Sequence, residues 1–168
     1  TQYDYGAAPG QLGFASHATV KTAGDASFPP QGPEAFFATA RGEVYVCDTA
    51  NSRIAVFSPT GSLARTVPLP RGITANDLVA DSTGLAVVYD ELQQTLTQLG
   101  ADGGVLASVR SETPFSSRGA LRLVGNTVWL AGPDQQEVAL ALVQNGILKA
   151  PEHPARRQAP SPGLHARS

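Results

Sequence analysis

Few side chains in this sequence are of the types that carry out catalysis, and their spacing is unfavourable. The three histidines, His17, His153 and His165, form no pair with the spacing of metal ligands. Cys47 is the single cysteine and stands inside an apolar run, which predicts a small buried residue and excludes an intrachain disulfide. No serine stands in a nucleophile elbow, and no glycine-rich loop follows a strand and opens a helix. Nucleophilic catalysis and nucleotide binding are therefore unsupported.

Two oxygen-bearing residues, Glu34 and Asn76, are the candidates for a metal site. They stand 42 residues apart (76 − 34), and each leads into an apolar run. Oxygen ligands of this kind suit calcium or another hard cation. One acid and one amide make a poor coordination set, and the third position at this spacing, near 119–120, offers no ligand. We therefore expect no metal and no cofactor, and interpret both residues as ordinary polar residues at strand ends.

Arginines in turn segments are the better candidates for recognition. Arg71 stands in Pro-Arg-Gly and Arg118 in Ser-Arg-Gly, two segments built from turn residues. Together with Asn51 and Glu91 at loop tips, they are predicted to crowd one face and contact an anion or a peptide. The alternative interpretation is that both arginines are simply solvated.

Composition limits the protein class. The chain has 168 residues, 42% hydrophobic and 15% charged, which is typical of one folded domain or part of a larger one. The formal net charge of −2 argues against nucleic-acid binding, which needs a concentrated basic surface. No run approaches the roughly 20 apolar residues of a membrane-spanning helix.

An internal repeat is the strongest signal in the sequence. The segment 42–61 returns without a gap 42 residues later (84 − 42), so that Asp48 falls on Asp90 and Ile54 on Leu96. A third, fainter copy follows, in which Trp129 is one of the residues that replace the apolar run 44–46. A fixed period of this size indicates stacked supersecondary units.

Each period is predicted to contain four short strands, bounded by Gly, Pro, Asp and Asn. The runs VYVC, IAVF, AVVY and VALALV are apolar on both faces, so both faces of each sheet should be covered. The fold class is therefore all-β, with about three four-stranded β-propeller blades. The predicted strands are 35–40, 43–48, 53–58, 62–67, 77–81, 85–90, 94–99, 104–109, 120–124, 127–131, 137–143 and 146–149.

The blades are expected to occupy 33–150, divided at about 33–70, 71–114 and 115–150. Residues 1–32 fit neither the helical nor the strand period and are interpreted as an extended segment with at most one short strand. Residues 151–168 are rich in Pro, Ser, Ala and Arg, and a disordered tail is expected there.

The segment Asp48-Thr-Ala-Asn-Ser-Arg53 is predicted to be a hairpin with a four-residue loop. Asp48 and Arg53 then face each other across the ladder, and such a pair contributes roughly 0.2–1 kcal/mol. Asn51 suits a left-handed or Asx-turn position, and Gly61 supplies backbone freedom to the next turn. We interpret Asp48 and Arg53 as a structural pair.

These residues resemble the NHL-repeat family, most closely over 33–68, less over 75–110 and weakly over 118–148. The second copy keeps Asp90 but has Gln93 and Thr95 at the other two hairpin positions. The third copy keeps none of them, having Gly132, Gln135 and Glu137. The resemblance implies a propeller in which the hairpin Asp and Arg serve blade structure. Lactonase-like and lyase-like propellers place metal ligands on the central axis, which is where Glu34 and Asn76 would fall.

We predict a non-catalytic binding or scaffold module with a protein or peptide partner. The alternative is a metal-dependent propeller enzyme, lactonase-like or lyase-like. Three blades do not close a ring. The chain is therefore expected to be part of a longer protein, to form a six-bladed homodimer, or to cover an open edge with residues 1–32. The resemblance and the missing initiator methionine favour a bacterial periplasmic or secreted location.

Overall fold

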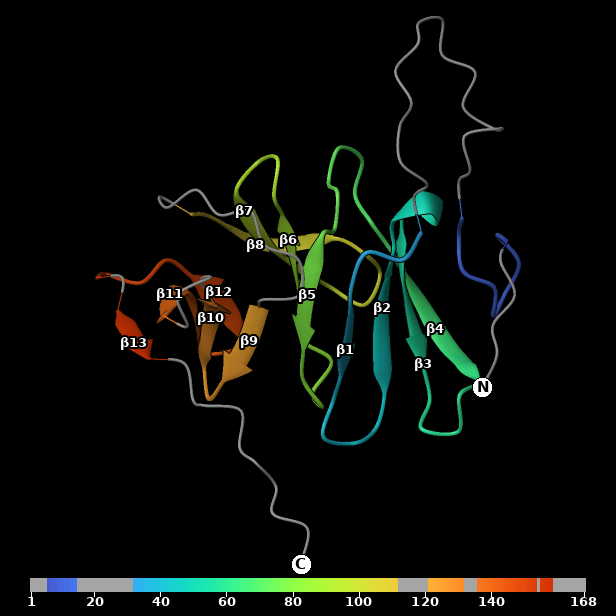
Figure 1. The fold of residues 1–168 in the computed structure, drawn as a ribbon, viewed down its shortest axis with the longest axis horizontal. Coiled ribbons are helices and arrows are strands. Elements are labelled where there is room, and N and C mark those ends of the chain that lie inside the picture. Colours follow the sequence, from blue (N-terminus) through green and yellow to red (C-terminus); the bar gives the residue numbers. More distant parts are fainter. Residues whose placement is uncertain (1–5, 15–31, 112–120, 132–135, 154, 159–168) are drawn as a thin grey trace, which may run out of the picture.

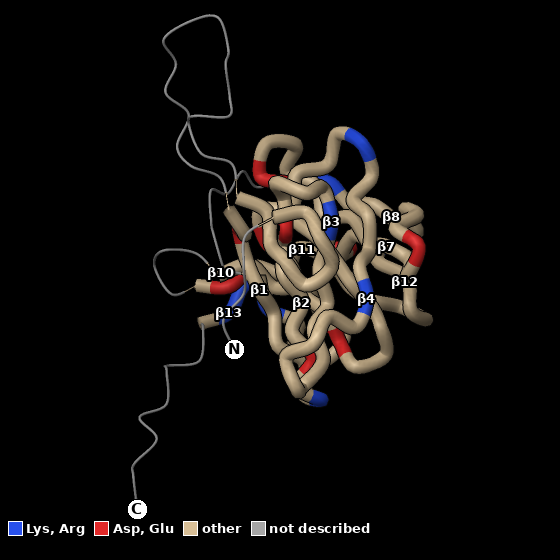
Figure 2. The backbone as a smooth tube through the Cα atoms, turned by 90° about the vertical axis from the view of Figure 1, so that its right-hand side faces the viewer, with Lys and Arg blue, Asp and Glu red and all other residues tan. Residues whose placement is uncertain are grey.

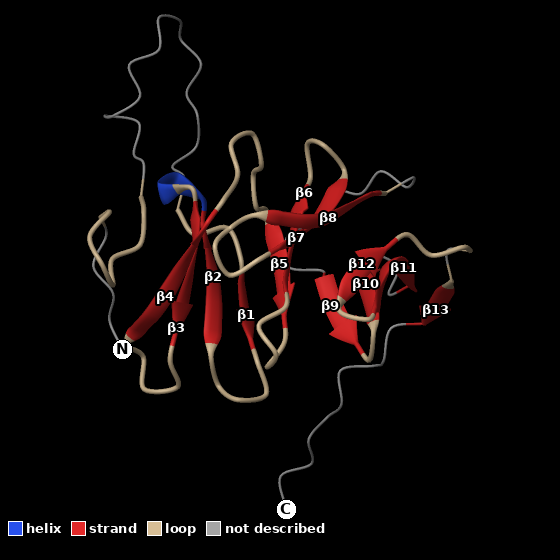
Figure 3. Cartoon of the chain, turned by 180° about the vertical axis from the view of Figure 1, so that it is seen from behind, coloured by secondary structure: helices blue, strands red, loops and turns tan. Residues whose placement is uncertain are grey.

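The protein is an all-β stack of three antiparallel sheets, as the repeat predicts. A computed structural model describes residues 6–14, 32–111, 121–131, 136–153 and 155–158. Figure 1 shows the three sheets side by side, with β1, β5 and β9 as the inner strands and β5 in contact with the other two. These ranges hold thirteen strands and one 3-10 turn, η1 (Thr49–Asn51), which is the short helix seen from behind in Figure 3.

Every sheet is a meander in which consecutive strands pair, so each sheet is one propeller blade. The strands begin and end within two residues of the predicted bounds. The first sheet holds β1 (Phe36–Ala38), β2 (Val44–Asp48), β3 (Arg53–Phe57) and β4 (Leu63–Pro68). The second holds β5 (Asp77–Ala80), β6 (Ala86–Asp90), β7 (Thr95–Leu99) and β8 (Val105–Arg110). The third holds β9 (Leu121–Val124), β10 (Thr127–Ala131), β11 (Gln136–Gln144) and β12 (Ile147–Lys149).

The core lies between the blades, because runs that are apolar on both faces need cover on both sides. Tyr45 and Ile54 of blade 1 pack with Leu78 and Val88 of blade 2 in one cluster. A second cluster joins blades 2 and 3. Its main members are Val79, Val87, Tyr89, Leu96, Val128, Leu130 and Leu140. The central sheet is therefore buried on both faces.

Two buried polar side chains also join blade 2 to blade 3. The Gln98 amide donates to Gly146 O (2.7 Å) and accepts from Leu148 N–H (2.8 Å). Asp77 Oδ2 accepts from Leu121 N–H (2.9 Å), which links the inner strands of the two blades. A buried polar group must be hydrogen-bonded to be tolerated, and here its partner is the main chain of the neighbouring blade.

The loops agree with the predicted turn chemistry except at one position. Gly61 adopts a positive φ of 83°, as its turn requires. In the β2–β3 hairpin the left-handed residue is Ser52 rather than Asn51, which lies in η1. Gln94, 42 residues after Ser52, is also left-handed with a φ of 54°. The fourth loop position therefore carries the positive φ in both hairpins. Asn51 instead contributes side-chain hydrogen bonds, to Gly6 O and to Asp48.

The sequence placed residues 151–168 in a disordered tail, and the structure corrects this at three of them. Strand β13 (Arg156–Gln158) pairs with the first half of β11. The cause is Arg157, whose Nε lies 2.6 Å from Oε2 of the buried Glu137 and whose guanidinium stacks 4.0 Å over the Trp129 ring. The last part of that segment, 159–168, lies outside the described residues.

Charged side chains are interspersed over the described fold. In the side view of Figure 2, basic and acidic positions are scattered over several strands and turns. Among the described residues this view shows no basic stripe of the kind that marks a nucleic-acid surface. None of the helices in the described ranges is long and apolar enough to cross a membrane.

Candidate functional site

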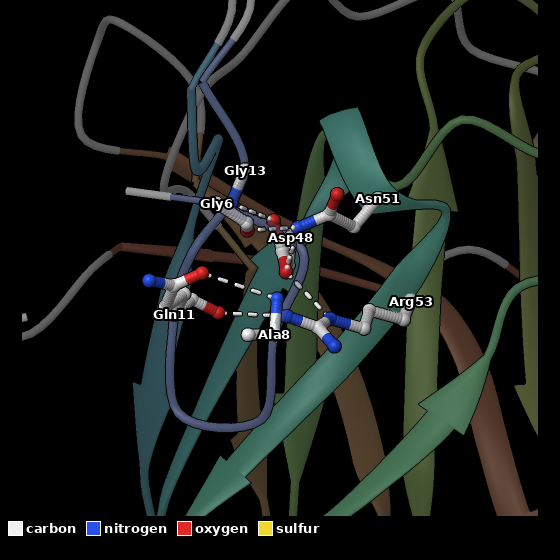
Figure 4. Close-up of polar contacts among 7 residues, drawn as sticks. All are labelled: Gly6, Ala8, Gln11, Gly13, Asp48, Asn51 and Arg53. Carbon is white, nitrogen blue, oxygen red and sulfur yellow. Dashed lines mark hydrogen bonds and ion pairs between the residues drawn. The ribbon is translucent and has the colours of Figure 1, made fainter. Parts of the chain in front are cut away.

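The β2–β3 hairpin of blade 1 carries a polar cluster around the fully buried Asp48 (Figure 4). Asp48 faces Arg53 across the ladder, as predicted, and its Oδ2 lies 2.6 Å from Arg53 Nε. The same oxygen accepts from Asn51 Nδ2 at 2.9 Å. Oδ1 accepts the N–H of Gly13, far away in sequence, at 2.6 Å. The carboxylate is thus shared between its own hairpin and the N-terminal segment.

Asn51 and Arg53, the two partners of Asp48 in this hairpin, also bind the main chain of the N-terminal segment. Asn51 Nδ2 donates to Gly6 O at 2.8 Å, and Arg53 Nη2 donates to Gln11 O at 2.7 Å. Three side chains therefore hold three main-chain groups of residues 6–13. We call Asp48, Asn51 and Arg53 the first clamp.

The segment held by the first clamp is a compact loop. Gln11 N–H donates to Ala8 O (3.0 Å) across Pro9-Gly10, and Gly10 has a φ of 82°, as a type II turn requires. Gly6 N–H donates to Leu12 O (2.8 Å) and closes the loop. Leu12 packs on the face of blade 1 that points away from blade 2. That apolar face is formed by Val44, Val46, Ala55, Phe57 and Leu63.

Blade 2 carries a second clamp at the same repeat position. Asp90 Oδ2 accepts from Thr74 N–H (2.9 Å), and Gln93 Nε2 donates to Gly72 O and to Asp90 Oδ2. From sequence, Gln93 counts as a loss of Asn51. In the structure its amide makes the same two kinds of bond. Thr95, which replaces Arg53, bonds locally to Gln93 O (3.1 Å) and makes no bond to a distant segment among the residues that the structure describes.

Of the four predicted recognition residues, Arg71 and Glu91 lie on two segments that a hydrogen bond joins. Arg71 is exposed in the connection that leads into blade 2, next to the Gly72 carbonyl held by the second clamp. Glu91 lies at the tip of the β6–β7 hairpin. Asn51 belongs to the first clamp, and Arg118 lies outside the described residues. Sequence reasoning missed Leu92, beside Glu91, whose side chain is 90% exposed.

Glu34 and Asn76 occupy equivalent strand-end positions, as expected. Glu34 N–H donates to Cys47 O and Asn76 N–H to Tyr89 O. The Asn76 side-chain oxygen accepts from Glu91 N–H at 2.9 Å, so it orders the neighbouring hairpin tip. No group of three or more His, Cys, Asp or Glu within the described ranges is arranged to hold a metal. The axis position near 119–120 lies outside those ranges.

Cys47 is expected to resist alkylation in the folded protein. Burial raises the pKa of its thiol well above the ordinary value, and the charges of Asp77 and Glu34 raise it further. Because the thiolate is the reactive form, iodoacetamide at pH 8 should label the native chain at least about a hundredfold more slowly than the unfolded chain. Mass spectrometry measures both rates, and equal rates would contradict the prediction. A raised folded-state pKa also means that stability falls as the pH rises above about 8.5.

A hollow of about 350 Å³ lies between blades 1 and 2, at the end of the sheets opposite the hairpin clamps. Its polar lining residues are Arg41, Glu43, Tyr45 and Arg65 from blade 1 and Ser82 and Thr83 from blade 2. Arg65 is already engaged, with Nη2 2.5 Å from the Tyr45 hydroxyl and Nη1 3.4 Å from Glu43. Burial raises the pKa of Tyr45, and the Arg65 charge opposes this. Sequence reasoning missed this hollow because separate turns of two blades build it.

Comparison with known proteins gives likeness to solved structures alone. No family model matches the sequence, and no curated protein matches it. A streptogramin B lyase structure has a TM-score of 0.49 at 17% identity, over 68% of this chain and 39% of that one. Virginiamycin B lyase from Staphylococcus aureus has 0.49 at 14%, over 83% and 44%. A duf4221 family member from Bacteroides vulgatus has 0.49 at 15%, over 70% and 42%. The chain thus spans less than half the length of each of these structures.

Proposed function

We propose that this chain is a non-catalytic binding module whose hairpin tips and blade connections hold a protein or peptide partner. The observation that carries the proposal is the β6–β7 tip, which presents Leu92 to solvent and is hydrogen-bonded to the connection that carries the exposed Arg71. An exposed apolar side chain and a guanidinium on two joined segments offer both an apolar and a charged contact. Loops on a rigid scaffold are the usual place for recognition.

The tip is held in one conformation before any partner arrives. Glu91 N–H is bound by Asn76, and Gln93 N–H by Asp90 Oδ1 (2.9 Å). Gln94 Nε2 donates to Glu91 O at 2.6 Å and closes the loop. Preorganisation of this kind removes most of the entropy cost of ordering a loop on binding. The scaffold therefore favours recognition through Leu92 and its neighbours.

The connection that carries Arg71 is fixed to the same tip. Gln93 of the tip bonds to Gly72 O, and Thr74 N–H bonds to Asp90. Arg71 and Leu92 thus lie on two segments that are joined by hydrogen bonds. The resemblance of the segment 42–61 to NHL repeats supports the same proposal, because this segment and its copy supply the two clamps.

Peptides selected against the whole chain from a random phage-displayed library test the proposal. Replacing Arg71 and Leu92 together by alanine should weaken the selected peptides at least about tenfold, because each change removes a central contact. Leu106→Ala is the matched control, since Leu106 is an exposed leucine (54%) on β8, outside the loop face. Fluorescence anisotropy measures the affinities. Equal affinity for the double variant and the control would refute the proposed face.

A further inference from the structure

The two clamps are one device repeated after 42 residues, and they hold segments of different origin. In each, an aspartate accepts a main-chain N–H while an amide donates to a glycine carbonyl. The second clamp holds the connection that leads into its own blade, at Gly72 and Thr74. The same positions one period earlier are 30 and 32 (72 − 42 and 74 − 42). The first clamp instead holds Gly6 and Gly13, so it selects its segment by contacts rather than by repeat position.

We propose that the first clamp is a binding site for the main chain of a glycine-containing polypeptide segment, and that residues 6–14 are its occupant within this chain. The inference deepens the proposed function, because it names a second peptide site and the chemistry that the site reads. It needs neither Arg71 nor Leu92.

Its main-chain contacts make the first clamp suited to a ligand other than the connection that leads into its own blade. Asp48, Asn51 and Arg53 together bind one N–H and two carbonyls of the occupant. The second clamp lacks the arginine and makes two such contacts in the described structure. The connection held by the second clamp leads directly into its own blade, whereas residues 15–31 stand between the segment 6–14 and blade 1. The longer tether restricts the segment less, and the additional bond from Arg53 to Gln11 O compensates for this.

The site reads glycine at the position that faces Asp48. A Cβ at Gly13 would lie 2.7 Å from Ala50 Cβ, 2.8 Å from Asp48 Oδ1 and 2.9 Å from Asn51 Nδ2. Contacts this short force a shift, and the Asp48 carboxylate is fixed by Arg53. Directly before this glycine, Leu12 rests on the apolar face that includes Val46 and Phe57. The structure therefore assigns Leu-Gly as the core of the recognised sequence, after a turn that presents the Gln11 carbonyl.

A labelled synthetic peptide with the sequence of residues 6–14 tests the site in the full chain. In the wild-type protein the tethered segment competes at an effective concentration in the millimolar range. In the Gly13→Ala protein the tethered segment no longer fits, so the apparent affinity for the peptide should rise at least about tenfold. Gly32→Ala is the matched control, since within the described part of the chain a Cβ there meets Phe14 alone, at an ordinary 3.6 Å. It should bind the peptide as the wild type does.

Two further measurements define what would overturn the proposal. A peptide with alanine at the Gly13 position should show no binding, and adding Asp48→Asn to the Gly13→Ala protein should abolish binding of the glycine peptide. Equal binding of both peptides, or no binding to the Gly13→Ala protein, overturns the site. The Gly13 amide of the wild-type protein should exchange at least about a hundredfold more slowly than in the free peptide. Exchange at the free-peptide rate overturns the site even if the variants do not fold.

Failure of this test differs from failure of the proposed function. The library peptides depend on Arg71 and Leu92 and are scored against Leu106→Ala. The 6–14 peptide depends on Asp48 and Gly13 and is scored against Gly32→Ala. Loss of one result leaves the other standing.

Discussion

Replacing Asp48 by alanine will lower the free energy of unfolding by about 3–5 kcal/mol, because it removes one partner of a buried ion pair. Of its bonds within the described structure, Arg53 then keeps the one to Gln11 O, and the N–H of Gly13 loses its acceptor. A buried donor without a partner costs about 1–3 kcal/mol, and these losses are not additive. Thermal unfolding should shift down by roughly 6–20 °C, measured by circular dichroism alongside urea titration.

Asp90→Ala is the matched control, since Asp90 holds the same position one period later and is also buried. Its contacts come from neutral groups, Thr74 N–H and the Gln93 amide, so the expected loss is smaller, about 1–3 kcal/mol. The difference between the two variants measures what Arg53 adds. Equal losses would mean that the ion pair contributes nothing beyond the hydrogen bonds. In that case Arg53 would act only through Gln11 O.

The strands were predictable because their signals are local. Turn residues bound each run, and apolar pairs such as Tyr45 and Ile54 recur one period later as Val87 and Leu96. The same residues decide burial, since a run that is apolar on both faces needs a neighbour on each side. Both features lie within one repeat, and a single sequence therefore contains them.

The clamps could be predicted only in part, because half of each lies elsewhere in the chain. The pairing of Asp48 with Arg53 follows from hairpin geometry. The partner segment does not, because Gly13 is 35 residues from Asp48 and fits no period. At Gln93 the sequence underestimates what is kept. The change from Asn51 to Gln93 looks like loss of the repeat motif, but the side-chain amide that makes the contact is still present.

Buried polar contacts between blades were also hidden from sequence. Gln98 lies within β7 between Thr97 and Leu99, and its partners are main-chain groups of Gly146 and Leu148. Such partners have no side-chain identity, so no residue pattern marks them. The β13 strand was hidden for a different reason, because the side chains that hold it come from separate segments. It depends on Arg157 meeting Glu137 and Trp129, a contact that composition alone does not indicate.

Leu78→Ala is expected to cost about 3 kcal/mol of stability, within the 2–5 kcal/mol usual for buried leucines, whereas Phe36→Ala should cost less than about 0.5 kcal/mol. The two positions are equivalent in the repeat (78 − 36 = 42), and both are inner-strand residues on the same face of their sheets. Leu78 is 1% exposed because blade 1 packs on it, and Phe36 is 74% exposed. Urea unfolding of both variants at two protein concentrations measures the difference.

The comparison separates the intrinsic preference of the position from the contribution of a neighbouring blade. Both residues are large and apolar and hold equivalent positions in equivalent inner strands, β1 and β5, so the position itself contributes similarly to both values. The remaining difference between the two losses of unfolding free energy comes from the apolar area of blade 2 that blade 1 covers. If Phe36→Ala costs as much as Leu78→Ala, and more at higher protein concentration, a second copy covers this face in solution. A small and concentration-independent loss means that the face stays open beside the loop that Leu12 anchors.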